Sequence, residues 1–123
     1  MIHLDTSVLI DALSGPKRSA ARLRDWIENR ERILLSALVL SEWFRGPRLP
    51  EELEAQEALF PSALSVPFGP HEAAVAADLY RTVRRPRGRE LDLAVAACAL
   101  THDASLWTLN PADFQDIPGL RLL

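Results

Sequence analysis

The first ten residues place an acidic side chain at the junction between a strand and a helix. Ile2 and Leu4 flank His3 in a mostly apolar run that is too short for a helix and suits a buried strand. Asp5 comes next, and residues 6–10 (Thr-Ser-Val-Leu-Ile) begin with helix-capping residues and continue in a helix-compatible pattern. In parallel α/β sheets, ligands bind at the carboxyl edge of the strands. Asp5 is therefore expected at a ligand-binding edge.

Length and composition indicate one globular domain, covering residues 1–123. Hydrophobic residues make up 48% of the chain and charged residues 25%, which is ordinary for a soluble protein. The chain has no apolar run long enough to span a membrane and does not begin like a signal peptide, so we expect a cytoplasmic protein without membrane contact. Its net charge of −3 argues against broad electrostatic wrapping of nucleic acid, but not against a nuclease that uses metal ions.

Strand-like and helix-like segments alternate along the chain. Helices are expected at residues 6–13, 19–30, 37–45, 50–60, 70–83 and 90–102, and strands at 2–4, 33–35, 64–66, 105–108 and 120–122. This alternation predicts an α/β sandwich whose central sheet is mostly parallel and has four to five strands.

Two further acids interrupt apolar helices. Asp92 is the one charged residue among the apolar residues at positions 91–100, and a buried carboxylate is costly unless it is paired or binds a metal. The alternative is a partly exposed acid that the helix dipole favours in the first turn. Glu42 lies between apolar residues in the same way. The alternative interpretation of Glu42 is an ordinary surface glutamate between two packed faces of its helix.

A fourth acidic segment follows the strand expected at residues 105–108. Asn110 and Asp113 offer oxygen-bearing side chains there, although both residue types are also common turn formers. If Asp5, Glu42, Asp92 and this segment meet at one sheet edge, their like charges repel one another. Mg²⁺ or Mn²⁺, which prefer oxygen ligands, would relieve that repulsion. Zinc is disfavoured because the three histidines and the one cysteine show no ligand spacing.

The order and spacing of these residues resemble the PIN-domain ribonucleases, and most closely the VapC toxins of bacterial toxin–antitoxin pairs. The matching motifs are residues 5–7 (Asp-Thr-Ser), 41–42 (Ser-Glu), 92–99 (Asp-Leu-Ala-Val-Ala-Ala-Cys-Ala) and 108–114 (Thr-Leu-Asn-Pro-Ala-Asp-Phe). The resemblance covers essentially the whole chain and implies a PIN-like α/β/α sandwich. Each motif alone is weak, whereas four in this order are specific.

The resemblance also implies a function and a set of site residues. It implies a Mg²⁺-dependent endoribonuclease, with Mn²⁺ as an alternative, whose acidic pocket consists of Asp5, Glu42, Asp92 and the segment from Asn110 to Asp113. Asn110, Asp113 or both of them through water would reach the metal. Asp5 and Asp92 match the positions most regularly tied to the metal. The implied partners are an RNA substrate, a small antitoxin of the VapB kind bound along an apolar groove near the acidic pocket, and a second copy of the chain in a homodimer.

Two features outside the acidic motifs carry open alternatives. The basic turn at residues 84–89 either guides the RNA backbone towards the pocket or is a solvated loop. Trp26, Trp43 and Phe44 are expected in the core or at a dimer interface, with the antitoxin groove as a further possibility.

Two other functions compete with the nuclease. One is a degenerate domain that acts only as a binding partner. The other is an aspartyl phosphotransferase, which also places an Asp after the first strand. That class needs a lysine at a later strand end, and some members need a second Asp two residues after the first; here the only lysine is Lys17, and position 7 is Ser7.

Overall fold

The structure of the protein is a computed structural model that describes all 123 residues. The chain contains three strands and six α-helices, with two helices between the first and second strands and four between the second and third. The strands are β1 (Ile2–Leu4), β2 (Ile33–Leu34) and β3 (Ser105–Trp107). The helices are α1 (Thr6–Leu13), α2 (Ala20–Glu28), α3 (Ala37–Arg45), α4 (Pro50–Leu59), α5 (Pro70–Thr82) and α6 (Glu90–Thr101), with short 3₁₀ turns at Ser62–Leu64 and Pro111–Asp113. All six predicted helices are confirmed, with ends that differ from the prediction by at most two residues.

The sheet is parallel and has β1 at its centre, in the order β2-β1-β3. Ile2 pairs with Ile33 on one side and with Ser105 on the other. Because the strands are parallel, their carboxyl ends lie at one edge, where Asp5 follows β1 and Thr108 follows β3. An acid at this position can therefore meet side chains that lie far away in the sequence.

The prediction of four to five strands is wrong in its count. The two additional segments each contribute one isolated parallel bridge, Ser36 to Val66 and Leu106 to Leu122. The Val66 N–H donates to the Leu35 carbonyl and its C=O accepts from the Ala37 N–H, and the pairing stops there because the partner chain enters helix α3 at Ala37. The second bridge is formed three residues after a turn at Gly119, and its bonds are Leu106 N–H to Arg121 O and Leu123 N–H to Leu106 O. Both segments lie in the expected places but are too short to count as strands.

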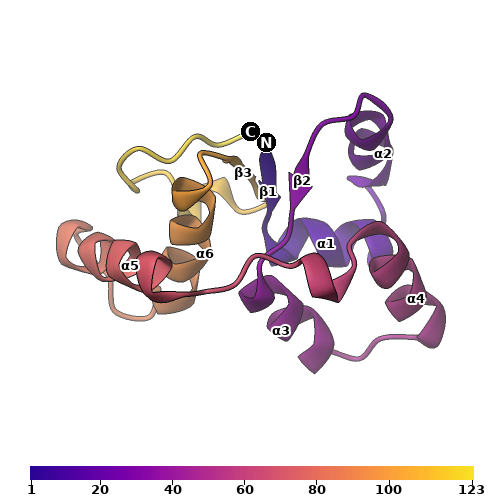
Figure 1. The fold of residues 1–123 in the computed structure, drawn as a ribbon, viewed down its shortest axis with the longest axis horizontal. Helices are drawn as coiled ribbons and strands as arrows, with labels where there is room; N and C mark the ends of the chain where they lie inside the picture. Colours follow the sequence, from indigo (N-terminus) through magenta and orange to yellow (C-terminus); the bar gives the residue numbers. More distant parts are fainter.

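The helices cover the sheet on both sides. Figure 1 shows α5 and α6 on one side and α1, α2 and α4 on the other, while α3 lies near the carboxyl edge of the strands and contacts both α1 and α6. The centre of α6 is enclosed, with every residue from Leu93 to Ala99 buried. A helix that is apolar on all sides is normally buried on most faces, and Asp92 lies at the N-terminal end of this buried stretch. No helix in the structure has the length and apolar character needed to cross a membrane.

Candidate active site

The four acids predicted from the sequence come from four separate parts of the fold, and three of them act on the fourth, Asp92. Asp5 occupies the N-cap position of α1, Glu42 lies in α3, Asp92 in the first turn of α6 and Asp113 in the 3₁₀ turn after β3. The charges of Asp5, Asp113 and Glu42 all act on the Asp92 carboxyl group. The fold thus brings these four carboxylates to the same end of the sheet.

Asp5 is buried and is held by two hydroxyl groups. Ser7 Oγ donates to Asp5 Oδ2 at 2.9 Å, and Thr108 Oγ1 donates to the same oxygen at 2.7 Å. Each hydroxyl also accepts a hydrogen bond from a backbone N–H of the turn after β3, Leu109 to Ser7 and Asn110 to Thr108, both at 3.0 Å. These bonds orient both hydroxyl protons towards Asp5. They leave Oδ1 of Asp5 without a hydrogen-bond partner.

Glu42 is half-buried and has two neighbours. Thr6 Oγ1 donates to Glu42 Oε1 at 2.6 Å, which links the start of α1 to α3. Arg45, one turn further along α3, lies with its Nη2 atom 3.6 Å from Glu42 Oε2. The hydroxyl contacts of Thr6, Ser7 and Thr108 fix the geometry of the acids. The sequence analysis missed Arg45, although its spacing of three residues from Glu42 was a detectable signal.

Asp92 is the acid whose ionisation the site most opposes. Its pKa is raised to about 6, first by burial and then by the negative charges of Asp5, Asp113 and Glu42, while Arg89 acts in the opposite direction. No side chain or backbone N–H donates a hydrogen bond to its carboxylate, and it forms no ion pair. A carboxylate with this environment is typical of functional sites rather than of structural ion pairs.

The turn that carries Asn110 and Asp113 is fastened to the start of α6. Arg89 donates through both terminal nitrogens to the Asp116 carboxylate, at 2.8 and 2.6 Å, and also to the backbone carbonyl of Asp113 at 3.0 Å. The Asn110 and Asp113 side chains are both exposed and accept no hydrogen bond. Sequence reasoning missed Asp116, because its partner lies 27 residues earlier in the chain.

The oxygen atoms of this site suit a hard divalent cation, but the side chains do not form a closed coordination shell. No group of three or more His, Cys, Asp or Glu side chains is arranged to hold a metal ion. Asp5 Oδ1 and both oxygens of Asp92 are free of hydrogen bonds, and ionised carboxylate oxygens are the ligands that Mg²⁺ and Mn²⁺ prefer. The donor chemistry therefore fits such an ion.

Comparison with known proteins identifies the class of this fold and site. The family model of the PIN domain matches residues 2–120, and the chain belongs to that family. Its relatives include the ribonuclease VapC19 of Mycobacterium tuberculosis, 34% identical over 120 residues that cover 96% of this chain and 95% of the relative. The ribonuclease VapC1 of Rickettsia felis is 33% identical over 134 residues, covering 98% and 92%. Within the PIN family, the chain is thus a homologue of the VapC ribonucleases.

Solved structures agree on the fold. The VapBC2 complex of Rickettsia felis bound to a promoter DNA fragment superposes with a TM-score of 0.76, at 23% identity and with coverage of 100% of this chain and 98% of that one. FitAB bound to a DNA fragment gives a TM-score of 0.74 at 22% identity, covering 100% and 94%. These likenesses establish the PIN fold over the full chain.

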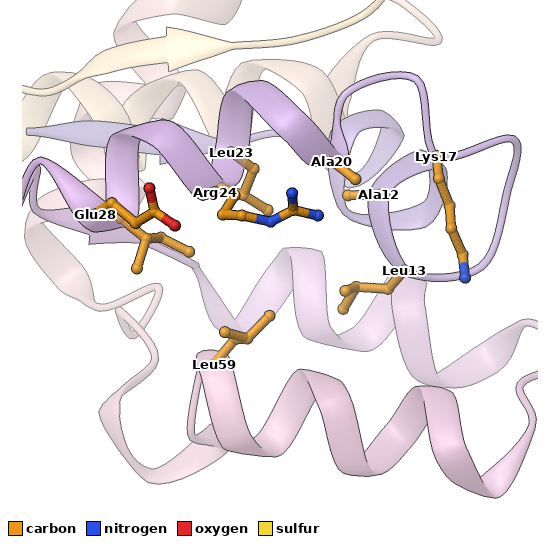
Figure 2. A pocket seen from close by; sticks show the side chains of 9 residues that line it. Ala12, Leu13, Lys17, Ala20, Leu23, Arg24, Glu28 and Leu59 are labelled. Atoms are coloured by element: carbon orange, nitrogen blue, oxygen red, sulfur yellow. The ribbon is translucent and has the colours of Figure 1, made fainter.

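A separate groove lies at the C-terminal end of α1, away from Asp5. It has a volume of about 460 Å³ and lies between α1, α2 and the end of α4. Figure 2 shows Leu13, Leu23 and Leu59 around it, with Arg24 extending along it, Lys17 at one end and Glu28 at the other. The remaining lining residues are Ala12, Ala20 and Ile27. The groove is therefore apolar with charged ends.

None of the three aromatic residues singled out from the sequence lines this groove. Trp43 is fully buried, which confirms a core position and excludes it from any groove. Trp26 is half-buried and packs on Trp107, with ring centroids 5.0 Å apart. Phe44 is 50% exposed and borders a shallow hollow on α3 together with Leu40. Phe44 is thus the one aromatic of the three that is available to a partner.

Proposed function

We propose that this chain is a metal-dependent endoribonuclease that hydrolyses RNA phosphodiester bonds and acts as the toxin of a toxin–antitoxin pair. One observation carries the proposal: Asp5, Glu42 and Asp113 converge on Asp92, which has neither a hydrogen-bond donor nor an ion-pair partner. The VapC relatives, named as ribonucleases, support the same activity. We further propose that residues 1–123 act as one PIN domain.

Asp5 and Asp92 are the residues that would hold a divalent ion, Mg²⁺ or Mn²⁺, because their free oxygens face no competing donor. Glu42 and Asp113 would complete the acidic site, with Asn110 as the alternative to Asp113. When bound, such an ion supplies positive charge that offsets both the carboxylates and the phosphate, and it acidifies the attacking water. The expected products are a 5′-phosphate and a 3′-hydroxyl.

The chain's own residues contribute positioning. Ser7 and Thr108 hold the Asp5 carboxylate in one orientation through their hydroxyl groups. These hydroxyl groups are themselves oriented by hydrogen bonds from the backbone N–H groups of Leu109 and Asn110. Thr6 holds the Glu42 carboxylate in the same way. Hydrogen bonds that fix an acid before substrate arrives reduce the reorganisation needed during the reaction.

The test is RNA cleavage by purified protein free of any antitoxin, in Mg²⁺, in Mn²⁺ and in EDTA. We expect cleavage with either metal and none in EDTA. Asp5→Ala and Asp92→Asn should abolish cleavage while the circular dichroism spectrum stays that of the wild type. Asp25→Asn, which removes an equal charge from the exposed face of α2, should keep full activity. Near wild-type cleavage by either site variant contradicts the assignment, and no cleavage with either metal favours the binding module.

We propose that the groove in Figure 2 receives an apolar segment of the antitoxin. The solved relatives with this fold include toxin–antitoxin complexes, which supports a protein partner of this kind. The groove has the apolar floor that a partner segment needs, and Lys17 and Arg24 suit an acidic residue on that segment. Leu59→Asp changes a side chain that is 45% exposed, so it should weaken antitoxin binding without unfolding the protein. Asp92→Asn should bind the antitoxin as the wild type does.

We also propose that the chain forms a homodimer through the α3 face that bears Phe44. That face exposes the apolar side chain of Phe44, which is 50% exposed and borders the hollow on α3. Light scattering should give twice the chain mass of 13.7 kDa, and Phe44→Glu should return it to the single-chain mass. A wild-type protein with the single-chain mass contradicts this proposal.

A further inference from the structure

The turn between α5 and α6 carries three arginines that have no partner in the protein. Arg84, Arg85 and Arg87 are exposed and form no ion pair or side-chain hydrogen bond. Several other arginines in the chain are engaged, such as Arg81 with Asp78, Arg121 with Asp103, and Arg48 over the ring of Trp43. Arg18, Arg24, Arg30 and Arg32 are also exposed and unpaired, but no three of them lie within four consecutive residues. Three free guanidinium groups within four residues therefore form a concentrated patch of positive charge, which we call the arginine turn.

The arginine turn is held firmly beside the acidic site. The backbone N–H of Arg89 donates to the Pro86 carbonyl at 2.9 Å, and Gly88 takes a left-handed φ of 85° that closes the turn around Arg87. The Arg89 side chain then bonds the Asp116 carboxylate and the Asp113 carbonyl. Arg89 is thus fixed at the N-cap of α6, three residues before Asp92.

The charges of the site favour such a patch for a polyanionic substrate. The chain as a whole carries a net charge of −3, and four of its carboxylates lie at the point where cleavage would take place. An RNA strand approaching that point is repelled unless positive groups near it bind its phosphates. Arginine suits this task because its planar guanidinium group donates to two phosphate oxygens at once.

We propose that Arg84, Arg85 and Arg87 bind consecutive phosphates of single-stranded RNA and lead the strand to Asp92. This inference rests on the proposed nuclease function, since it assigns the path of the substrate to that site. Phosphate contacts of this kind fix the position of the strand and carry no sequence preference. The arginine turn therefore contributes affinity and alignment, and any base preference comes from other residues.

The test compares RNA binding by two triple variants that remove the same charge. The first is Arg84→Gln/Arg85→Gln/Arg87→Gln. The control is Arg18→Gln/Arg30→Gln/Arg32→Gln, whose side chains are exposed and lie in the α1–α2 and α2–β2 connections, away from the acidic site. Fluorescence anisotropy of a labelled single-stranded RNA 12-mer, in EDTA so that it is not cut, gives Kd over a range of NaCl concentrations.

The expected result is a change in salt dependence. Three lost phosphate contacts should make the slope of log K against log salt about 2 units shallower. The ratio of wild-type to variant RNA affinity should therefore fall about 18-fold between 50 and 200 mM salt. In Mg²⁺, the same variant should raise KM for RNA cleavage and leave kcat within about two-fold, because the residues bind substrate without entering the chemistry. The control variant should keep the wild-type slope and KM.

Each other outcome is decisive. If the wild type cleaves RNA but the arginine-turn variant has the wild-type slope and KM, the inference fails while the nuclease proposal stands. The same holds if the control variant shows as large a change in slope and KM as the arginine-turn variant. If the wild type neither binds nor cleaves RNA, both fail. Should the triple variant unfold, as shown by circular dichroism, the single variants Arg84→Gln, Arg85→Gln and Arg87→Gln replace it, and each should reduce the slope by about 0.7.

Discussion

The unfavourable charge on Asp92 makes a direct prediction about stability. Asp92→Asn removes that charge and keeps the shape of the side chain, so the variant should be more stable than the wild type at neutral pH and without metal. The pKa of Asp92 rises from an ordinary value of 3.8 to about 6 in the folded protein. At 1.36 kcal/mol per pKa unit, the full shift corresponds to about 3 kcal/mol. Asp92 is partly exposed, and solvent screening reduces this to about 1–2 kcal/mol.

The pH dependence follows from the direction of the shift. Because the folded state keeps its Asp92 proton to a higher pH than the unfolded state, wild-type stability falls as pH rises from about 4 to 6 and stays lower above that range. The variant has no such titration. The stability difference between the variant and the wild type should therefore be close to zero near pH 4 and reach its full size by about pH 7.5.

Urea unfolding in EDTA at several pH values measures this difference. Asp25→Asn serves as the control, because it removes an exposed carboxylate that forms no ion pair and should change stability by less than about 0.5 kcal/mol. Added Mg²⁺ should stabilise the wild type more than the variant and so narrow the gap. If Asp92→Asn is no more stable than the wild type at pH 7.5, or if the gap does not vary with pH, the description of a crowded acidic site is wrong.

Three further predictions concern other parts of the molecule. His3 is fully buried, neither ring nitrogen has a partner, and burial lowers its pKa to about 4. His3→Leu should raise the free energy of unfolding by about 1–2 kcal/mol and reduce the loss of stability that the wild type shows as pH falls from about 6.5 to 4. A variant less stable than the wild type at pH 7 would contradict this. Thr108→Val removes a donor to Asp5 and should reduce RNA cleavage about 10- to 100-fold with an intact fold, so unchanged cleavage would exclude a positioning role. Arg89→Gln and Asp116→Asn should each slow cleavage, and the exchange Arg89→Asp/Asp116→Arg should recover part of the rate. If the exchange variant cleaves no faster than the two single variants, the pair does not position the turn.

The helices could be predicted from the sequence because their signals are local. Ser36 is a residue type that favours the N-cap position, and in the structure its Oγ accepts from the Val39 N–H at 3.2 Å at the start of α3. Pro50 and Pro70 each mark a first helical turn. The strand count failed because strand pairing is not local: residues near Val66 and Leu122 are apolar enough for strands, but whether a second residue finds a partner depends on the neighbouring chain.

The site shows the same division between local and distant signals. Asp92 stood out because it is one acid in an apolar helix, and the pattern itself implied an unusual environment. The hydrogen-bonded ion pair between Arg89 and Asp116 joins residues that are 27 positions apart, and no local sequence pattern around either residue predicts it. His3 was visible as a polar residue within an apolar strand, yet only the structure shows that both of its ring nitrogens lack partners.

The environment of Asp92 also separates a functional acid from a structural one. Four other carboxyl groups, Asp11, Glu52, Glu57 and Asp116, have pKa values lowered chiefly by hydrogen bonds that favour their ionised forms. Asp92 alone among the shifted carboxyl groups is raised, because burial and three neighbouring acids oppose its charge. A variant with asparagine at this position would have a more stable folded state, because it carries no charge there. The presence of an acid where ionisation is disfavoured therefore supports the proposal that the site binds a divalent cation.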